Sequence, residues 1–192
     1  MTETSRESGS TAAEPELVRQ FAEIVAKSVD VDPSVVTAET NLFDLGVESI
    51  EILEISLDVE EAFNIALPEQ DILQTAESVF GEDVLEQGGV LTEAGLRMLS
   101  ERIPGFAPSS EGKTTVADAR RQFAGVEVWH RMIGGLMALT PTACRTCGGA
   151  LVASPPAQLK CEACGLEHDL PAGDDVNLAW VREYYERVQG AS

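Results

Sequence analysis

The sequence predicts a mainly α-helical chain that carries a small cysteine-rich module near its C-terminal end, followed by a last helix. Apolar residues recur at helical spacing along most of the chain, and glycine or proline separates these stretches. All four cysteines fall between positions 144 and 164. An apolar content of 44% in 192 residues is enough for a buried core in one domain or two small ones.

Two helices are predicted in the first third of the chain. Between Glu14 and Lys27, with Pro15 at an opening position, apolar residues repeat at helical spacing: Leu17, Phe21, Ile24 and Val25. A second helix begins at or just before Ser49, and its apolar stripe advances by three and four residues: Ile52, Ile55, Val59 and Phe63. We expect the two helices to pack antiparallel after a long connection over 30–47, with the Ser49 hydroxyl placed to cap the second helix.

The residues around Ser49 form a motif: Asp44-Leu-Gly-Val-Glu-Ser49-Ile-Glu, then Glu54, Val59-Glu-Glu-Ala-Phe-Asn-Ile and Leu67-Pro68. This motif resembles the prosthetic-group segment of acyl carrier proteins. That family usually has Asp-Ser-Leu at its centre, whereas this chain has Glu-Ser-Ile, which keeps the charge and the branched apolar side chain. The resemblance implies a 4'-phosphopantetheine arm joined to the Ser49 hydroxyl through a phosphodiester. The simpler alternative is a serine that only caps its helix.

The resemblance implies a carrier and not an enzyme. No base stands beside Ser49 in the motif to activate its hydroxyl, so a separate phosphopantetheinyl transferase must attach the arm. The carrier would present acyl groups as thioesters to discrete enzymes of lipid or polyketide-type synthesis. Two alternatives stay open: an aminoacyl or peptidyl carrier, and an unmodified adaptor of the same fold that docks its partners through the cysteine-rich module.

The formal net charge of −20 is unevenly distributed along the chain. Residues 1–104 hold 5 Lys/Arg and 23 Asp/Glu, a net of −18, whereas residues 105–192 carry a net of only −2. Such a field disfavours nucleic acid and anionic membranes as partners, and it favours enzymes with basic docking patches. We therefore expect loading and transfer enzymes to dock on the acidic helix that follows Ser49 through four of its acids: Glu51, Glu54, Glu60 and Glu61. A merely solvated acidic face is the alternative.

The resemblance implies a four-helix bundle like that of acyl carrier proteins over 14–124, with a helical insertion at about 81–113. A short third helix is expected from Leu67 through Leu73, and Thr114–Arg120 looks like the family's fourth helix. The alternative for the fourth helix is Thr92–Ile103, which otherwise lies inside the insertion. Residues 125–139 are expected to form a bridging helix, loosened by Gly134-Gly135, that packs the carrier against the module that follows.

The cysteines form two Cys-x-x-Cys-Gly knuckles separated by 13 residues: Cys144, Cys147, Cys161 and Cys164. Four thiolates at this spacing can converge tetrahedrally on Zn²⁺, with a β-hairpin through Ser154-Pro155-Pro156 between the knuckles. The pattern resembles a zinc ribbon, which implies a structural metal within a module over 140–192. Two disulfides or a redox Cys-x-x-Cys are the less favoured alternatives, since an exported context is lacking. Four thiolates leave no open position for a catalytic zinc.

The remaining features add no catalytic residue. His130 and His168 lie in no knuckle or acid and nucleophile arrangement, so we expect ordinary surface or packing roles. A last helix capped by Asp174 or Asp175 carries one apolar side over residues 178–188. Residues 1–13 are polar and are expected to be disordered. The chain has no signal-like apolar run and no stretch of 18 apolar residues, which predicts a cytoplasmic protein.

Overall fold

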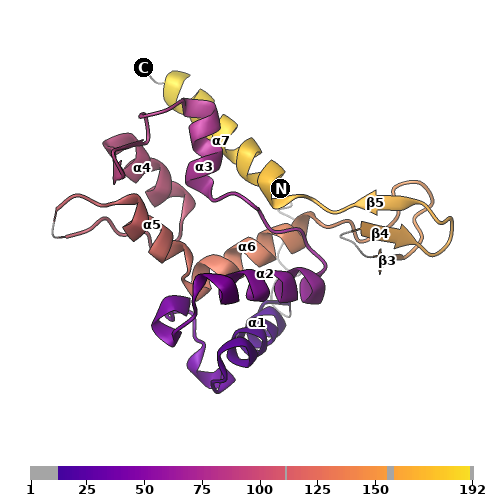
Figure 1. The fold of residues 1–192 in the computed structure, drawn as a ribbon. Helices are drawn as coiled ribbons and strands as arrows, with labels where there is room; N and C mark the ends of the chain where they lie inside the picture. The colour runs from indigo at the N-terminus through magenta and orange to yellow at the C-terminus, as the bar shows by residue number, and fades with distance from the viewer. Residues whose placement is uncertain (1–12, 111, 155–157, 191–192) are drawn as a thin grey trace, which may run out of the picture.

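The computed structural model describes residues 13–110, 112–154 and 158–190, so the expected disordered N-terminus lies, apart from Ala13, outside the described residues. The described chain is mainly helical with two small antiparallel sheets, which confirms the fold class (Figure 1). The helices are α1 (Ala13–Val29), α2 (Ser49–Phe63), α3 (Ile72–Phe80), α4 (Glu93–Arg102), α5 (Val116–Phe123), α6 (Val126–Leu139) and α7 (Gly173–Gly190). The 3-10 turns are η1 (Pro33–Val35) and η2 (Leu42–Leu45), and the strands are β1 (Glu86–Gln87), β2 (Val90–Leu91), β3 (Leu151–Ser154), β4 (Gln158–Cys161) and β5 (Glu167–Asp169).

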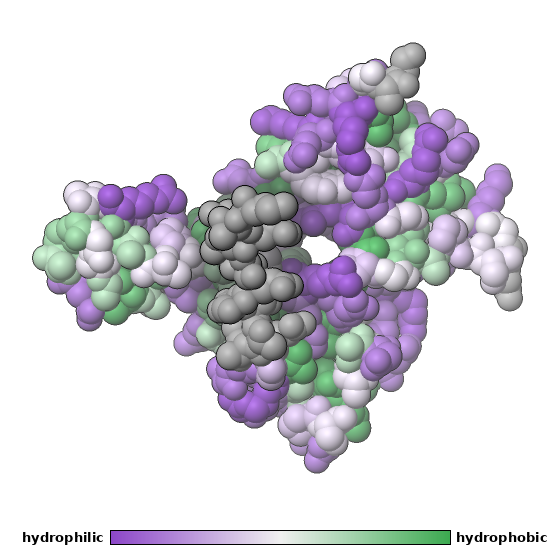
Figure 2. All heavy atoms as spheres, turned by 180° about the vertical axis from the view of Figure 1, so that it is seen from behind, coloured by the Kyte–Doolittle hydropathy of each residue, from purple (hydrophilic) through white to green (hydrophobic). Residues whose placement is uncertain are grey.

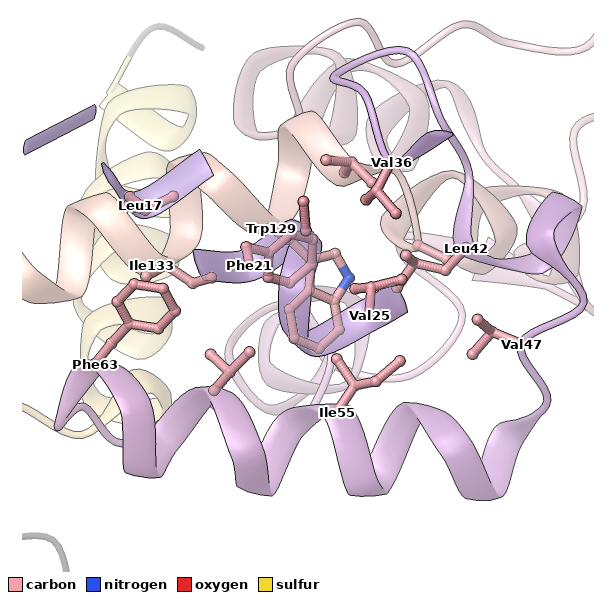
Figure 3. Close-up of a cluster of buried hydrophobic side chains, with 14 of the residues drawn as sticks. Leu17, Phe21, Val25, Val36, Leu42, Val47, Ile55, Phe63, Trp129 and Ile133 are labelled. Carbon is pink, nitrogen blue, oxygen red and sulfur yellow. The ribbon is translucent and has the colours of Figure 1, made fainter. Parts of the chain in front are cut away.

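A first hydrophobic core lies between α1, α2 and α6. The predicted stripe of α2 faces inward, and Ile55 and Phe63 point into the core (Figure 3). Val59 is also buried, and the partly buried Ile52 packs against the same core. The Trp129 ring of α6 packs on Phe21 of α1 with ring centroids 5.5 Å apart. The other buried residues of this core are Leu17, Ala22, Val25, Val36, Leu42, Val47, Ile65, Ala124, Val126, Ile133 and Leu136. The expected pairing of α1 with α2 is therefore present, and α6 completes the core.

A second core lies between α3, α4, α5, α7 and the β1–β2 hairpin. Helix α7 supplies Val181 and Tyr184. The other buried members are Ile72, Leu73, Ala76, Leu85, Leu91, Met98, Leu99 and Ala119. In Figure 1 this group of helices lies above the first core. The segment expected as an insertion thus folds into a hairpin and a helix that share this second core with α3 and α7.

The packing differs from expectation at the fourth helix. Both candidates are helical, as α5 and α4, but the buried side chains of both lie in the second core. The helix expected only to bridge, α6, supplies four buried residues to the first core: Val126, Trp129, Ile133 and Leu136. Helical spacing shows that a segment has an apolar face, but it does not show which other helices that face will pack against. The proposed boundaries between domains stay a prediction.

Two helix starts also differ from expectation. The third helix begins after Asp71, whose side chain accepts a hydrogen bond from Gln74 N at 2.9 Å, and it runs to Phe80. In α7, Asp174 lies within the first turn, and its carboxylate accepts hydrogen bonds from the backbone N–H groups of Glu69 and Gln70 at 3.2 and 3.1 Å. Asp174 therefore ties α7 to the segment that joins α2 and α3.

Strands β3, β4 and β5 form an antiparallel sheet that projects from the helices, as both views show (Figures 1 and 2). Leu151 pairs with Cys161 and Ser154 with Gln158, so the expected hairpin is present, while residues 155–157 at its turn lie outside the described residues. We call residues 140–172 the ribbon. Across the described ranges, no helix is both long and apolar enough to span a membrane.

Candidate functional site

The segment that leads into α2, residues 41–48, is here called the Ser49 loop. Its 3-10 turn begins with the Asn41 side chain, which accepts a hydrogen bond from Phe43 N at 3.1 Å. Gly46 then takes a left-handed conformation with φ of 88°, which a side chain would strain. Val47 is buried in the first core, so the loop is anchored immediately before the helix.

Ser49 is the first residue of α2 and is exposed. The prediction that its hydroxyl caps the helix is wrong by one position, because the capping residue is Glu48. Glu48 and Glu51 form a capping box in which Glu48 N donates to the Glu51 carboxylate at 2.5 Å. The Ser49 hydroxyl therefore lies at the positive end of the helix dipole without serving as its cap.

The outward face of α2 combines apolar and acidic side chains. Ile50, Leu53 and Leu57 are 62%, 56% and 57% exposed. Of the four acids expected to steer docking, Glu54 and Glu61 are exposed, whereas the other two have structural partners. Glu51 belongs to the capping box, and Glu60 accepts a hydrogen bond from Leu67 N at 2.8 Å.

The four predicted metal ligands converge in the ribbon. The sulfur atoms of Cys144, Cys147, Cys161 and Cys164 all lie within 4.8 Å of one another. The Cys147 and Cys161 sulfurs are 3.4 Å apart, well beyond the ~2.0 Å length of a disulfide bond. The thiols are free, and four such donors at this spacing could hold a metal ion.

The two knuckles share one backbone design. Gly148 N donates to the Cys144 carbonyl and Gly165 N to the Cys161 carbonyl, each at 2.9 Å. Both glycines have φ of 72°, a left-handed conformation that lets each chain turn around its sulfurs. A Cβ added at Gly149 would come within 3.1 Å of the Cys161 sulfur. The backbone at Gly149 therefore packs closely against the sulfur cluster and leaves little room for a side chain.

The backbone of each knuckle favours thiolate. The N–H groups of Cys147 and Thr146 lower the pKa of the Cys144 thiol to about 5. The Cys164 N–H likewise lowers the pKa of Cys161. For Cys147 the N–H of Gly149 acts in the same direction, but the neighbouring Cys161 and Cys164 sulfurs outweigh it and raise the pKa to about 12. The neighbouring thiolates thus make it harder for the last thiol to ionise. A divalent cation bound between the four sulfurs would stabilise their thiolate forms.

Sequence reasoning missed one contact of this cluster. His168 Nε2 lies 3.3 Å from the Cys144 sulfur, so this histidine is not an ordinary surface residue. Its position four residues after Cys164, on the third strand of the sheet, was the available signal. Metal-binding sulfurs commonly receive hydrogen bonds from nearby donors, and His168 is placed to supply one.

With this geometry in place, comparison with known proteins identifies the class. A family model described as the phosphopantetheine attachment site matches residues 19–79, which include Ser49 and its loop. The chain is 31% identical over 64 residues to an acyl carrier protein of Syntrophobacter fumaroxidans, which covers 32% of this chain and 79% of that protein. It is 32% identical over 75 residues to an acyl carrier protein of Guillardia theta, covering 38% of this chain and 93% of that one.

The chain belongs to the acyl carrier protein family, whose members are carriers and not catalysts. A chloroplast acyl carrier protein of Brassica napus is 34% identical over 84 residues, which is 43% of this chain and 63% of that protein. The family model ends at residue 79, before the β1–β2 hairpin, α4 to α7 and the ribbon. No solved structure shows a significant match.

Proposed function

We propose that this protein carries acyl groups as thioesters on a 4'-phosphopantetheine arm attached to Ser49, for separate enzymes of lipid or polyketide-type synthesis. The observation that carries the proposal is an exposed serine at the first residue of an amphipathic helix, inside the segment that matches the attachment-site family. When bound, the arm supplies a thiol that activates acyl groups for transfer. The relatives are named as acyl carriers, which favours acyl over aminoacyl cargo.

The chain's own residues hold and orient the arm. The first turn of α2 offers backbone N–H groups and the positive end of the helix dipole to a phosphate. Val47 and the capping box keep that turn in place. No base is hydrogen-bonded to Ser49 among the described residues, so a phosphopantetheinyl transferase supplies the chemistry of attachment.

Ser49→Ala tests the proposal directly. Incubation of the purified wild-type chain with a phosphopantetheinyl transferase and coenzyme A should raise its intact mass by one phosphopantetheinyl group, and Ser49→Ala should show no gain. Because Ser49 is exposed and does not cap the helix, the substitution should change the free energy of unfolding by only about 0.5 kcal/mol. Ser56→Ala, on the same helix, is the matched control and should still be modified. If the wild-type mass stays constant while a known carrier is modified in the same reaction, the carrier function is wrong, and an unmodified adaptor of the same fold is the interpretation that remains.

Charge reversal on α2 tests how partners dock. The double variant Glu54→Lys with Glu61→Lys should be loaded with acyl groups by its partner enzymes about tenfold more slowly than the wild type at low ionic strength. This difference in rate should shrink as salt screens the charges. Glu183→Lys with Glu186→Lys makes the same charge change on the exposed face of α7 and should leave the rate unchanged. Equal rates for the two double variants at every salt concentration would mean that the α2 acids only solvate the surface.

We further propose that the ribbon holds one structural Zn²⁺ through Cys144, Cys147, Cys161 and Cys164. The support is the convergence of four thiols, two matching backbone turns and the short approach at Gly149. A reducing compartment such as the cytoplasm would keep these thiols available as ligands. Zinc would give the ribbon a fixed shape that presents two exposed apolar side chains, Val152 and Leu166.

A further inference from the structure

The Ser49 loop is bound by a segment that lies far along the chain. We call residues 121–126, between the end of α5 and the start of α6, the α5–α6 junction. The Asn41 side-chain amide donates a hydrogen bond to the Arg121 carbonyl at 2.8 Å, and Leu42 N donates to the Ala124 carbonyl at 3.0 Å. Asn41 also pairs with Gly125 as an antiparallel bridge. The loop and the junction thus form a short two-stranded contact.

A side chain of the junction adds to this contact. The Arg121 guanidinium forms an ion pair with the Asp44 carboxylate at 2.5 Å. The same guanidinium lies over the Phe43 ring, 5.8 Å from its centroid. Arg121 therefore touches two consecutive residues of the Ser49 loop, while its carbonyl accepts the Asn41 amide.

The part of the chain that Arg121 contacts has no positively charged residue of its own. No lysine or arginine occurs between Lys27 and Arg97, a stretch that contains the Ser49 loop, α2 and α3. The Ser49 loop itself carries two acids, Asp44 and Glu48. The junction supplies a cation from outside this acidic stretch, which pairs with the Asp44 carboxylate.

We propose that Asn41 and Arg121 are positioning residues for attachment of the arm, so that the α5–α6 junction is part of the Ser49 site. The inference rests on the proposed function. The junction lies beyond residues 19–79, so the family match alone does not contain it. By holding the loop against α5 and α6, it keeps the free protein in the conformation that the transferase binds. When the contact weakens, a smaller fraction of the protein is ready to bind, and the apparent affinity falls by that fraction.

Asn41→Asp removes only the hydrogen bond that the Asn41 side-chain amide donates to the Arg121 carbonyl. Aspartate caps a helical turn as well as asparagine does and can still accept from Phe43 N, but it has no N–H group for the Arg121 carbonyl. We expect the KM of the transferase for the carrier to rise about tenfold with kcat unchanged. The variant also gains a negative charge, which would speed its association with a basic transferase. Electrostatic steering therefore cannot explain a higher KM.

Arg121→Gln and Arg120→Gln form a matched pair. The two arginines are neighbours on α5, and each variant loses one positive charge and one ion pair, since Arg120 pairs with Asp71 at 2.8 Å. We expect Arg121→Gln to raise KM about threefold, Arg121→Lys to restore part of the loss, and Arg120→Gln to match the wild type. Amide hydrogen exchange at Leu42 and Phe43 should accelerate in Asn41→Asp and Arg121→Gln but not in Arg120→Gln.

The outcomes separate this inference from the proposed function. If the wild-type chain gains no arm, the proposed function fails. If the wild type is modified and both Asn41→Asp and Arg121→Gln keep its KM and its exchange rates, the positioning role is wrong. Equal losses in Arg121→Gln and Arg120→Gln would also overturn it, because they would reflect only the net charge of α5.

Discussion

Removal of the metal should unfold the ribbon and leave Ser49 able to accept its arm. The described part of the ribbon has four buried residues, and two of them are cysteines: Cys144, Leu159, Cys161 and Leu170. A module with so small a core depends on its metal, and structural zinc supplies about 10–16 kcal/mol of apparent binding free energy in small zinc modules. The two helical cores contain none of these four residues.

The measurement combines a chelator with amide hydrogen exchange and intact mass. Exchange protection should be lost over β3 to β5 and retained in α1, α2 and α6, and the mass gain at Ser49 should persist. α7 should keep its protection as well, because Val181 and Tyr184 anchor it in the second core. Metal analysis that finds no zinc in reduced, natively purified protein, or arm attachment that fails after chelation, would contradict this division of the molecule.

Metal binding should weaken as the pH falls. The pKa of Cys147, raised to about 12, means that this thiol keeps its proton at neutral pH when no metal is bound. Binding must then release that proton, and a higher proton concentration opposes the release. Zinc affinity measured by competition with a chelator should therefore decrease from pH 8 to pH 6.

Trp129→Ala should lower the free energy of unfolding of the first core by about 3–5 kcal/mol. Trp129 is 6% exposed and packs on Phe21, so truncation leaves a cavity between α1 and α6. Chemical denaturation followed by circular dichroism would measure the loss. A loss below about 1 kcal/mol would mean that α6 is only a tether between carrier and ribbon.

The second tryptophan provides the control. Trp180 is partly buried against the second core, where it stacks on Tyr184 with ring centroids 5.3 Å apart and lies under the Arg102 guanidinium. Trp180→Ala should raise amide exchange in α3, α4 and α7, whereas Trp129→Ala should raise it in α1, α2 and α6. The same pattern of exchange in both variants would show that the two cores unfold as one.

Local pattern was sufficient for several parts of the molecule. The stripe of α2 is buried at Ile55, Val59 and Phe63, as its spacing of three and four predicted. The cysteine knuckles converge because each Cys-x-x-Cys-Gly turn is closed by its own backbone hydrogen bonds. In both cases the residues that determine the structure are neighbours in the sequence.

Short-range periodicity and turn chemistry encode the fold class, the helix that begins at Ser49 and the four-thiol cluster. The Glu48 cap of α2 is equally local, because its partner Glu51 lies three residues away. Two features depend instead on long-range packing: α6 rather than α5 completes the first core, and the α5–α6 junction holds the Ser49 loop. Asn41 and Arg121 lie 80 residues apart, and their contact depends on how α5, with Ala119 in the second core, leads into α6 in the first. Several helices of this chain have apolar faces, and the pairing among them is set by how all of the faces can be buried together, which no single segment records.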